Sequence, residues 1–268
     1  MNPPSARSVH TRLASSFSSY LSSWWSIVLF AAMILTLLPT CLSKKNRHAS
    51  AHHIVDSTVL NLAWFTVLSA LISVVIIRIV IVTALSYGLS RFAIEMVVRV
   101  LVLELIPLSA ALFVALRSSL PDSADLVQMS AQGRFETLRL QGINPIAEEF
   151  LPRVLAGVFC VWMLGAVSCI MTLLLTYFAM YGFTPWGLPA YTRVVGQVFS
   201  SAVTLILALK IFFFSLAVAF IPMASAYYDE LIDVPKRRTY FATGLAAMVR
   251  LFAVLLAIEV ISLMGNYY

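Results

Sequence analysis

The chain has 268 residues, of which 61% are hydrophobic and only 11% are charged. Soluble domains carry about 25% charged residues, so this chain has too few charges to cover a folded surface in water. The composition excludes a water-soluble globular enzyme, a disordered chain and a disulfide scaffold, and it predicts a polytopic membrane protein. The formal net charge of +6 is scattered along the sequence. That distribution favours basic residues in cytoplasmic loops over a nucleic-acid-binding patch.

The N-terminal part, residues 1–56, is predicted to hold a short helix on the membrane surface and one uncertain apolar segment. Leu13, Phe17 and Leu21 recur at helical spacing near the N-terminus. The apolar segment at about 24–42 is long enough to cross a bilayer, but basic residues flank both of its ends. It is therefore predicted to be either a transmembrane span or a re-entrant or partly immersed helix.

Five strong apolar segments follow, and they are expected to form one membrane domain over residues 57–268. Each exceeds the ~20 residues that cross about 30 Å of hydrocarbon. They lie at about 57–88, 93–117, 152–182, 198–225 and 239–265. The sequence thus predicts an all-α polytopic fold of five transmembrane helices, preceded by an N-terminal interfacial or re-entrant helical segment.

The distribution of Lys and Arg predicts the orientation of the spans. Basic residues gather before the first strong span, between the second and third, and before the last. These three regions are expected in the cytoplasm. The loops at about 88–93 and 183–197 carry few charges and the C-terminal tail carries none, so we expect them on the outer side.

The long loop between the second and third strong spans is predicted to contain an amphipathic helix at about 122–141. Asp122 and Ser123 can cap a helix, and Gly142 is a natural C-terminal stop. Asn144 and Pro145 then supply an N-cap and a first-turn proline for the next helix. One face of the predicted helix carries the apolar residues Val127, Ala131, Phe135 and Leu138, and Asp125 lies on another face. A plain connector needs only a few residues, so the pattern favours a docking surface for a cytoplasmic partner.

Seven ionisable residues lie inside the apolar segments, where a charge at the bilayer centre costs at least about 2.5–3.5 kcal/mol. They are Arg78, Glu95, Arg99, Glu104, Lys210, Arg250 and Glu259. The rise of an α-helix places Glu104 roughly 17 Å from the outer end of its span, and Lys210 at a similar depth. Glu95 and Arg99 form an i, i+4 pair.

Two interpretations of these charges are open: salt bridges that only join helices, or a partly wet cavity, open to the outside, that binds a polar headgroup between apolar walls. Glu104 and Lys210 are the leading substrate-binding pair. The further substrate-binding candidates are Arg78, Arg99 and Glu259. His48, His52 and His53 have no second ligand cluster beside them, so neither a metal nor a cofactor is predicted in this chain. The sequence has no P-loop, HExxH or GxSxG motif, so no catalytic residue is expected and a partner must supply any energy.

Four short stretches resemble one family of membrane proteins. Residues 103–107 (L-E-L-I-P) resemble the L-R-E-L-G-P signature of MlaE-type permeases, and residues 138–145 (L-R-L-Q-G-I-N-P) resemble the family's A-L-x-x-M-G-V-D-P. Residues 152–156 match P-R-x-x-A, and residues 209–213 resemble I-K-S-x-x-F. The arginine of the first signature is a leucine here, so the chain is identified as a divergent member.

The resemblance implies the permease subunit of an ATP-driven transporter that exchanges phospholipid with a periplasmic MCE-domain protein across the bacterial inner membrane. The implied partners are a second permease copy in a homodimer, the MCE protein, lipid, and cytoplasmic ABC ATPase subunits that hold ATP and Mg²⁺. The helix at about 122–141 would be the coupling helix. Its implied ATPase-coupling residues are Asp125, Phe135, Leu138, Gly142, Asn144 and Pro145. Two alternatives are an ion- or proton-coupled secondary transporter of an amphiphile, which would show inverted halves, and a membrane scaffold that transports nothing.

Overall fold

The computed structural model describes residues 24–37, 44–231 and 240–267, and the regular elements within these ranges are all helices. Five of the helices are long and apolar enough to cross a membrane. Their spans are Asn61–Ser86, Phe92–Ala131, Ile146–Tyr181, Ser201–Tyr228 and Gly244–Asn266. The predicted all-α fold with five strong spans is confirmed.

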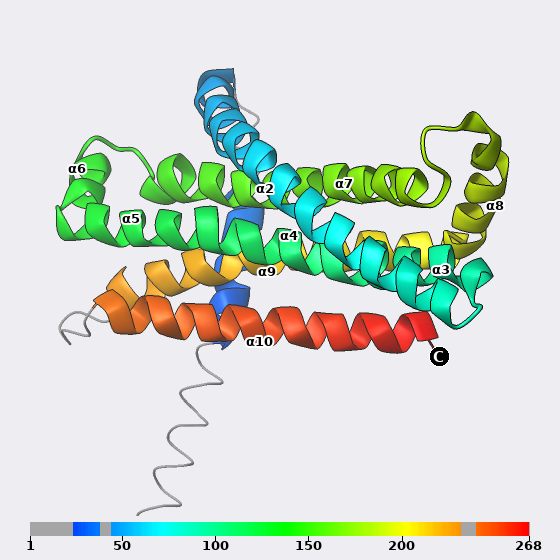
Figure 1. Ribbon diagram of the computed structural model, residues 1–268. Coiled ribbons are helices and arrows are strands. Elements are labelled where there is room, and N and C mark those ends of the chain that lie inside the picture. The colour runs from blue at the N-terminus through cyan, green and yellow to red at the C-terminus, as the bar shows by residue number, and fades with distance from the viewer. Residues whose placement is uncertain (1–23, 38–43, 232–239, 268) are drawn as a thin grey trace, which may run out of the picture.

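The long helices run roughly along one direction, and one of them crosses the others obliquely (Figure 1). The oblique helix is α2, which spans Lys44–Ser86 and packs mainly against α7, Leu151–Tyr181. The last two helices, α9 (Ser201–Leu231) and α10 (Tyr240–Tyr267), pack against each other. A buried apolar core of residues from α2, α4 (Ile106–Val114), α7, α9 and α10 joins them, and it includes Phe214 and Leu164.

The second span is one continuous rod in which α-helical and π-helical turns alternate. Its elements are α3 (Ser90–Met96), η1 (Val97–Leu105), α4 (Ile106–Val114), η2 (Ala115–Ser119) and α5 (Leu120–Ala131). The prediction that Asp122 and Ser123 begin a separate helix is therefore wrong. The hydroxyl of Ser123 donates to the Leu120 carbonyl (2.7 Å) within the rod instead of capping a new helix. The wider turn η2 lets the chain pass Pro121 without ending the helix.

The predicted helix at about 122–141 is divided into two helices. The first is the end of α5, and the second is α6, Arg134–Leu140. Gly133 separates them with a φ of +73°, a left-handed conformation that glycine adopts without steric strain. The cytoplasmic loop of the sequence prediction is thus a hairpin of α5 and α6.

The end of α6 has the predicted stop signals. Gly142 has a φ of +74°, and the Ile143 N–H donates to the Leu138 carbonyl (3.0 Å). With the bond from the Gly142 N–H to the Arg139 carbonyl (3.0 Å), this is a Schellman motif. The Oδ1 atom of Asn144 then accepts a hydrogen bond from the N–H of Ile146 (3.1 Å). The predicted roles of Gly142 and Asn144 in ending and starting helices are confirmed; η3 (Ile146–Phe150) then leads into α7.

The loop expected at about 183–197 contains a helix that the sequence analysis missed. After η4 (Pro185–Gly187), α8 (Leu188–Val198) runs across the end of the bundle (Figure 1). Tyr191 and Val198 are buried against residues of α3, η1 and α7. The Tyr191 hydroxyl donates to the Leu173 carbonyl (2.8 Å), and burial raises the pKa of Tyr191 to about 12, so it stays a donor at neutral pH.

The uncertain N-terminal segment is a short helix, Trp24–Leu37, which runs across the long helices (Figure 1). At 1.5 Å per residue it is roughly 21 Å long, less than the hydrocarbon thickness of about 30 Å. Phe30 and Ile34 are fully buried against the base of α7 and α9. The remainder of the predicted segment, residues 38–42, lies outside the described residues, so the choice between a span and a partly immersed helix stays a prediction. The predicted surface helix within residues 1–23 lies outside the described residues.

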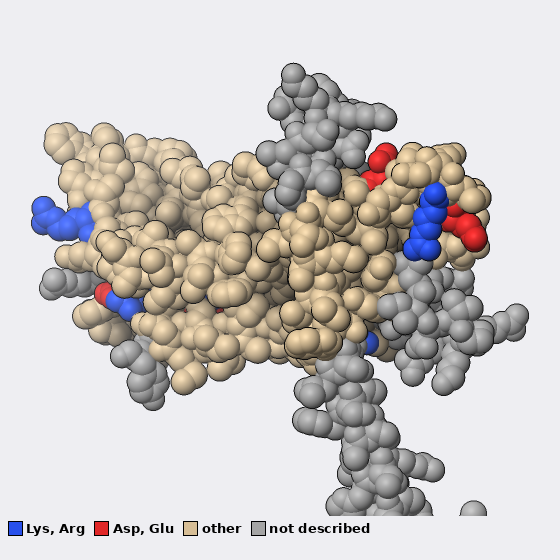
Figure 2. Space-filling view, turned by 180° about the vertical axis from the view of Figure 1, so that it is seen from behind, with Lys and Arg blue, Asp and Glu red and all other residues tan. Residues whose placement is uncertain are grey.

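The two ends of the bundle correspond to the two predicted sides of the membrane. The α5–α6 hairpin lies at one end, and α8, the turn before α3 and the C-terminus lie at the other (Figure 1). On the face shown in Figure 2, the described Lys, Arg, Asp and Glu side chains gather toward the two ends and leave a nearly uncharged band between them. Such a band is the surface that a bilayer requires of a multi-pass protein.

Candidate functional site

The ammonium group of Lys210 joins three membrane helices. Its side chain is only 1% exposed, and it forms ion pairs with Glu104 of η1 and with Glu259 of α10. The distance from Lys210 Nζ to Glu259 Oε2 is 2.9 Å. Lys210 Nζ also donates to the Leu103 carbonyl at 3.2 Å. The pair that the sequence singled out, Glu104 and Lys210, is therefore in direct contact, and Glu259 completes it.

Three oxygen atoms surround the Lys210 ammonium group, and two of them, Glu104 Oε2 and the Leu103 carbonyl oxygen, accept hydrogen bonds from it. The third, Glu259 Oε2, forms the ion pair but is buried without a hydrogen-bond partner among the described residues. The ring of Phe214 lies beside it, with its centroid 5.8 Å from Nζ. A new anion can therefore reach Lys210 only by displacing one of the protein oxygens.

The other carboxylate oxygen of Glu104 contacts the end of α10. Asn266 Nδ2 donates to Glu104 Oε1 at 3.1 Å, whereas Asn266 Oδ1 is buried without a hydrogen-bond partner among the described residues. Sequence analysis missed Asn266. A signal was present, because Glu259, Ser262 and Asn266 follow the three- and four-residue spacing of one helix face. We define the ion cluster as Lys210, Glu104, Glu259 and Asn266.

The ion cluster has one cation and two carboxylates. A buried ion pair is favourable only when its partners are well placed and hydrogen-bonded, and a second carboxylate beside the same ammonium adds negative charge. The Glu104 and Glu259 side chains are 11% and 12% exposed, whereas that of Lys210 is nearly sealed. The partly exposed groups of the cluster are thus the carboxylates of Glu104 and Glu259. Chemically, the cluster can exchange one anion for another beside Lys210.

Two of the predicted substrate-binding residues lie apart from the ion cluster. Arg99 Nη2 pairs with Glu95 Oε1 at 3.0 Å, which confirms the predicted i, i+4 contact, and both side chains are partly exposed. Arg78 is exposed on α2, and no ion pair joins it to another residue in the described part of the chain. The assignment of Arg78 and Arg99 to a substrate site stays a prediction.

The predicted ATPase-coupling residues divide into buried and exposed ones. Phe135 is buried, with its ring centroid 5.8 Å from that of Phe150, and Leu138 packs into the same apolar cluster. Asp125 is exposed on α5. Phe135 and Leu138 therefore hold α6 against the bundle, while Gly142 and Asn144 shape the corner that follows it.

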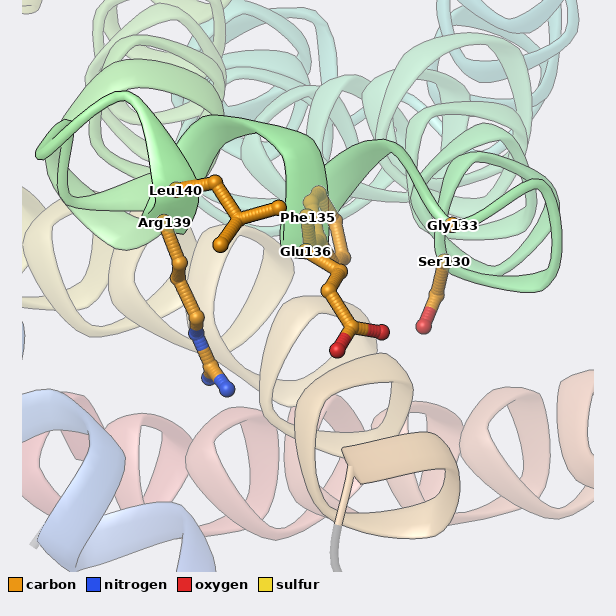
Figure 3. Close-up of a pocket in the computed structure, with 6 residues that line it drawn as sticks. All are labelled: Ser130, Gly133, Phe135, Glu136, Arg139 and Leu140. Atoms are coloured by element: carbon orange, nitrogen blue, oxygen red, sulfur yellow. The ribbon is translucent and has the colours of Figure 1, made fainter.

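The outer surface of the α5–α6 hairpin has a shallow pocket of about 340 Å³. Figure 3 shows its lining residues, which are Ser130, Gly133, Phe135, Glu136, Arg139 and Leu140. Glu136 and Arg139, of opposite charge, project in the same direction from α6 (Figure 3). Leu140 is 83% exposed, which is unusual for a leucine beside a folded core. Acidic, basic and apolar groups are thus presented together at this surface.

An ion network ties the hairpin to the base of α7. Glu149 lies 3.4 Å from Arg134 of α6 and 3.2 Å from Arg153 of α7, measured between carboxylate oxygen and guanidinium nitrogen. Arg153 is buried, and its Nη2 atom also contacts Met129 Sδ at 3.9 Å. Charged contacts as well as packing therefore join α6 to a membrane helix. The sequence analysis did not assign Glu149 or Arg153 a role.

No group of three His, Cys, Asp or Glu side chains with the geometry of a metal site occurs within the described residues. The side chains of His48, His52 and His53 lie outside the described part of the chain.

Fold and site together define a multi-pass membrane protein with an ion cluster between its spans and a patterned hairpin at one end. Residues 50–265 match the protein family described as Permease MlaE. The match covers most of the chain, so the protein belongs to the MlaE permease family. Members of this family are the membrane permease subunits of lipid-transport systems, work with ABC-type partners and are not themselves catalytic. No curated protein matches the chain.

Proposed function

We propose that this chain is the permease subunit of an ATP-driven phospholipid transporter in the bacterial inner membrane. Its proposed partners are cytoplasmic ABC ATPase subunits, which bind ATP and Mg²⁺, and a periplasmic MCE-domain protein that exchanges lipid with it. A second copy of the permease completes the proposed transport unit. The observation that carries the proposal is the pair of ion contacts that Lys210 makes with Glu104 and Glu259, inside a member of a lipid-transport family.

The chemistry of the ion cluster suits a phospholipid headgroup. The lipid phosphate is an anion, and Lys210 is the one cation of the cluster. Because the Lys210 side chain is almost sealed by its neighbours, the phosphate must replace a carboxylate rather than add to it. Glu104 keeps a second contact through Asn266, whereas the recorded ion pair of Glu259 is the one with Lys210. Glu259 is thus the carboxylate that the phosphate displaces.

Displacement of Glu259 provides two states with different contacts. Without lipid, Glu259 neutralises Lys210; with lipid, the phosphate does so and the released carboxylate is available to the ammonium group of a zwitterionic headgroup. A conformational equilibrium is biased only by such differential contacts. The cluster therefore gives the transporter a way to distinguish its loaded state from its empty state.

The α5–α6 hairpin is the proposed ATPase contact. Leu140 supplies an exposed apolar anchor, and Glu136 and Arg139 supply charges of both signs beside it. An apolar anchor with a polar rim is the usual anatomy of a protein interface. The Glu149 network then links movement of α6 to α7 and so to the membrane domain.

The experiment is lipid transfer by the complex purified from membranes and reconstituted in proteoliposomes, with bound lipids identified by mass spectrometry. Lys210→Met should abolish ATP-dependent transfer while the subunits still co-purify. Glu95→Gln is the matched control, because it neutralises a glutamate on the same span outside the ion cluster, and it should transfer lipid normally. Leu140→Glu should prevent co-purification of the ATPase without unfolding the permease.

Three results would refute the proposal. Transfer by the Lys210→Met complex at the unaltered rate would exclude the ion cluster as the lipid site. Loss of assembly in place of transfer would favour the scaffold alternative. Transport driven by an ion gradient, with no ATPase bound, would favour the secondary transporter.

A further inference from the structure

Two neighbouring carbonyl groups of η1 accept hydrogen bonds from other membrane helices. The Leu103 carbonyl accepts from Lys210 Nζ of α9 (3.2 Å), and the Val102 carbonyl accepts from Cys169 Sγ of α7 (3.7 Å). Carbonyl groups inside a helix normally bond to N–H groups of their own helix, four residues further on in an α-helix and five in a π-helix. Side-chain donors at two successive carbonyls therefore require a local cause.

Two features at this point together supply that cause: the bonding changes from π-helical in η1 to α-helical in α4, and Pro107 lies at the change. It lies four residues after Leu103 and five residues after Val102, which are the α-helical and the π-helical donor positions for these two carbonyls. Proline has no backbone N–H, so it donates to neither. The preceding residue still makes a π-helical bond, from the Ile106 N–H to the Leu101 carbonyl. The backbone hydrogen bonding of this span thus continues as far as Ile106, and the next residue, Pro107, has no N–H to donate.

We infer that Pro107 is a positioning residue for the ion cluster: by withholding a backbone N–H, it leaves the Leu103 carbonyl to accept a hydrogen bond from the Lys210 ammonium group. The carbonyl adjoins Glu104, so one turn of η1 supplies both a carboxylate and a backbone oxygen to Lys210. Because a lipid bilayer supplies no water to an unsatisfied donor, this backbone acceptor fixes where the buried ammonium group lies. The placement of Lys210 by Pro107 does not depend on the proposed function. Only an effect of that placement on lipid transfer would rest on it.

The test is a double-mutant cycle on thermal stability, which needs no transport. Position 107 belongs to the α-helix α4, so alanine there restores an N–H that, in the α-helical register, competes with Lys210 for the Leu103 carbonyl. Pro107→Ala alone should lower Tm by about 2–4 °C, but in the Lys210→Met background the decrease should be below about 1 °C. Pro222→Ala is the matched control, since Pro222 also lies inside a membrane helix, α9, but is remote in sequence from the Leu103 carbonyl that Lys210 contacts. Its effect should be the same in both backgrounds. An equal decrease for Pro107→Ala in both backgrounds would overturn the inference.

A backbone ester separates the missing N–H from the rigidity of the proline ring. An α-hydroxy acid at position 107, introduced by nonsense suppression, has neither the N–H nor the ring. We expect its Tm to stay within about 1 °C of that of the unaltered protein. A decrease as large as that of Pro107→Ala would assign the effect to the ring and refute the inference. Neither outcome depends on lipid transport, so failure of the proposed function would leave this result readable.

Discussion

Replacing Lys210 with methionine should destabilise this protein more than neutralising either of its acidic partners. Methionine retains much of the volume of the lysine stem but has no charge. The substitution leaves Glu104 and Glu259 close together without a cation, in a site where the lysine side chain is 1% exposed. The structure therefore predicts that loss of the cation lowers thermal stability more than loss of either carboxylate.

The magnitude follows from the burial of the pairs. Removing one partner of a buried ion pair costs about 3–5 kcal/mol. Because 1 kcal/mol shifts the Tm of a domain of this size by about 2–4 °C, Lys210→Met should lower Tm by roughly 6–20 °C. Glu259→Gln leaves one ammonium paired with one carboxylate, and it replaces a charged contact with a neutral one at a cost of about 1.5–3 kcal/mol. Its Tm should fall by about 3–12 °C.

The assay is thermal unfolding in lipid nanodiscs, followed by the fluorescence of the five tryptophans and by circular dichroism. The triple variant Lys210→Met, Glu104→Gln, Glu259→Gln should recover most of the lost stability, because no unpaired charge remains. If Lys210→Met were as stable as Glu259→Gln, the ammonium would not hold the two carboxylates together in the membrane, and the reasoning would fail.

Further predictions concern the corner after α6, the contact of α2 with α7, and the ion network. Gly142→Ala should lower Tm by about 2–4 °C, because alanine at a φ of +74° costs about 1 kcal/mol; Gly244→Ala, where nothing lies within 4 Å of the added Cβ, should not. Ser73→Ala removes the hydrogen bond to Thr172 (2.9 Å) and should cost about 0.6–1.7 kcal/mol. The cost should disappear in a Thr172→Val background, and persistence there would contradict the hydrogen-bond explanation. Glu149→Gln breaks both ion pairs of the network and should increase hydrogen–deuterium exchange in α6; unchanged exchange would show that packing alone holds the hairpin.

The number and position of the spans could be predicted because their cause is local. Hydrocarbon thickness sets the required length of each apolar segment, and composition shows where such segments lie. The stop at Gly142 and the cap at Asn144 could also be predicted, since each depends on backbone geometry within a few residues. Sequence spacing likewise identified the pair of Glu95 and Arg99 on one helix face.

Other features could not be predicted, because they depend on neighbours distant in the sequence. Asp122 and Ser123 have the composition of a helix start, yet the π-helical turn before Pro121 carries the helix through them. The outer loop folds into α8 because Tyr191 and Val198 find apolar partners on α3, η1 and α7. Phe135 faces inward because Phe150 and the base of α7 occupy its side of α6.

The ion cluster shows the same division. By itself, the sequence determined that Glu104, Lys210 and Glu259 lie within apolar spans, where an isolated charge is too costly to leave without a partner. It did not determine which partner each would have, since more than one hundred positions separate Glu104 from Lys210. Only the packing of η1, α9 and α10 brought these groups together with Asn266 and excluded Arg78 and Arg99. The reason is physical: hydropathy is a property of one segment, whereas an ion pair is a property of two surfaces, and its geometry exists only after the helices have packed.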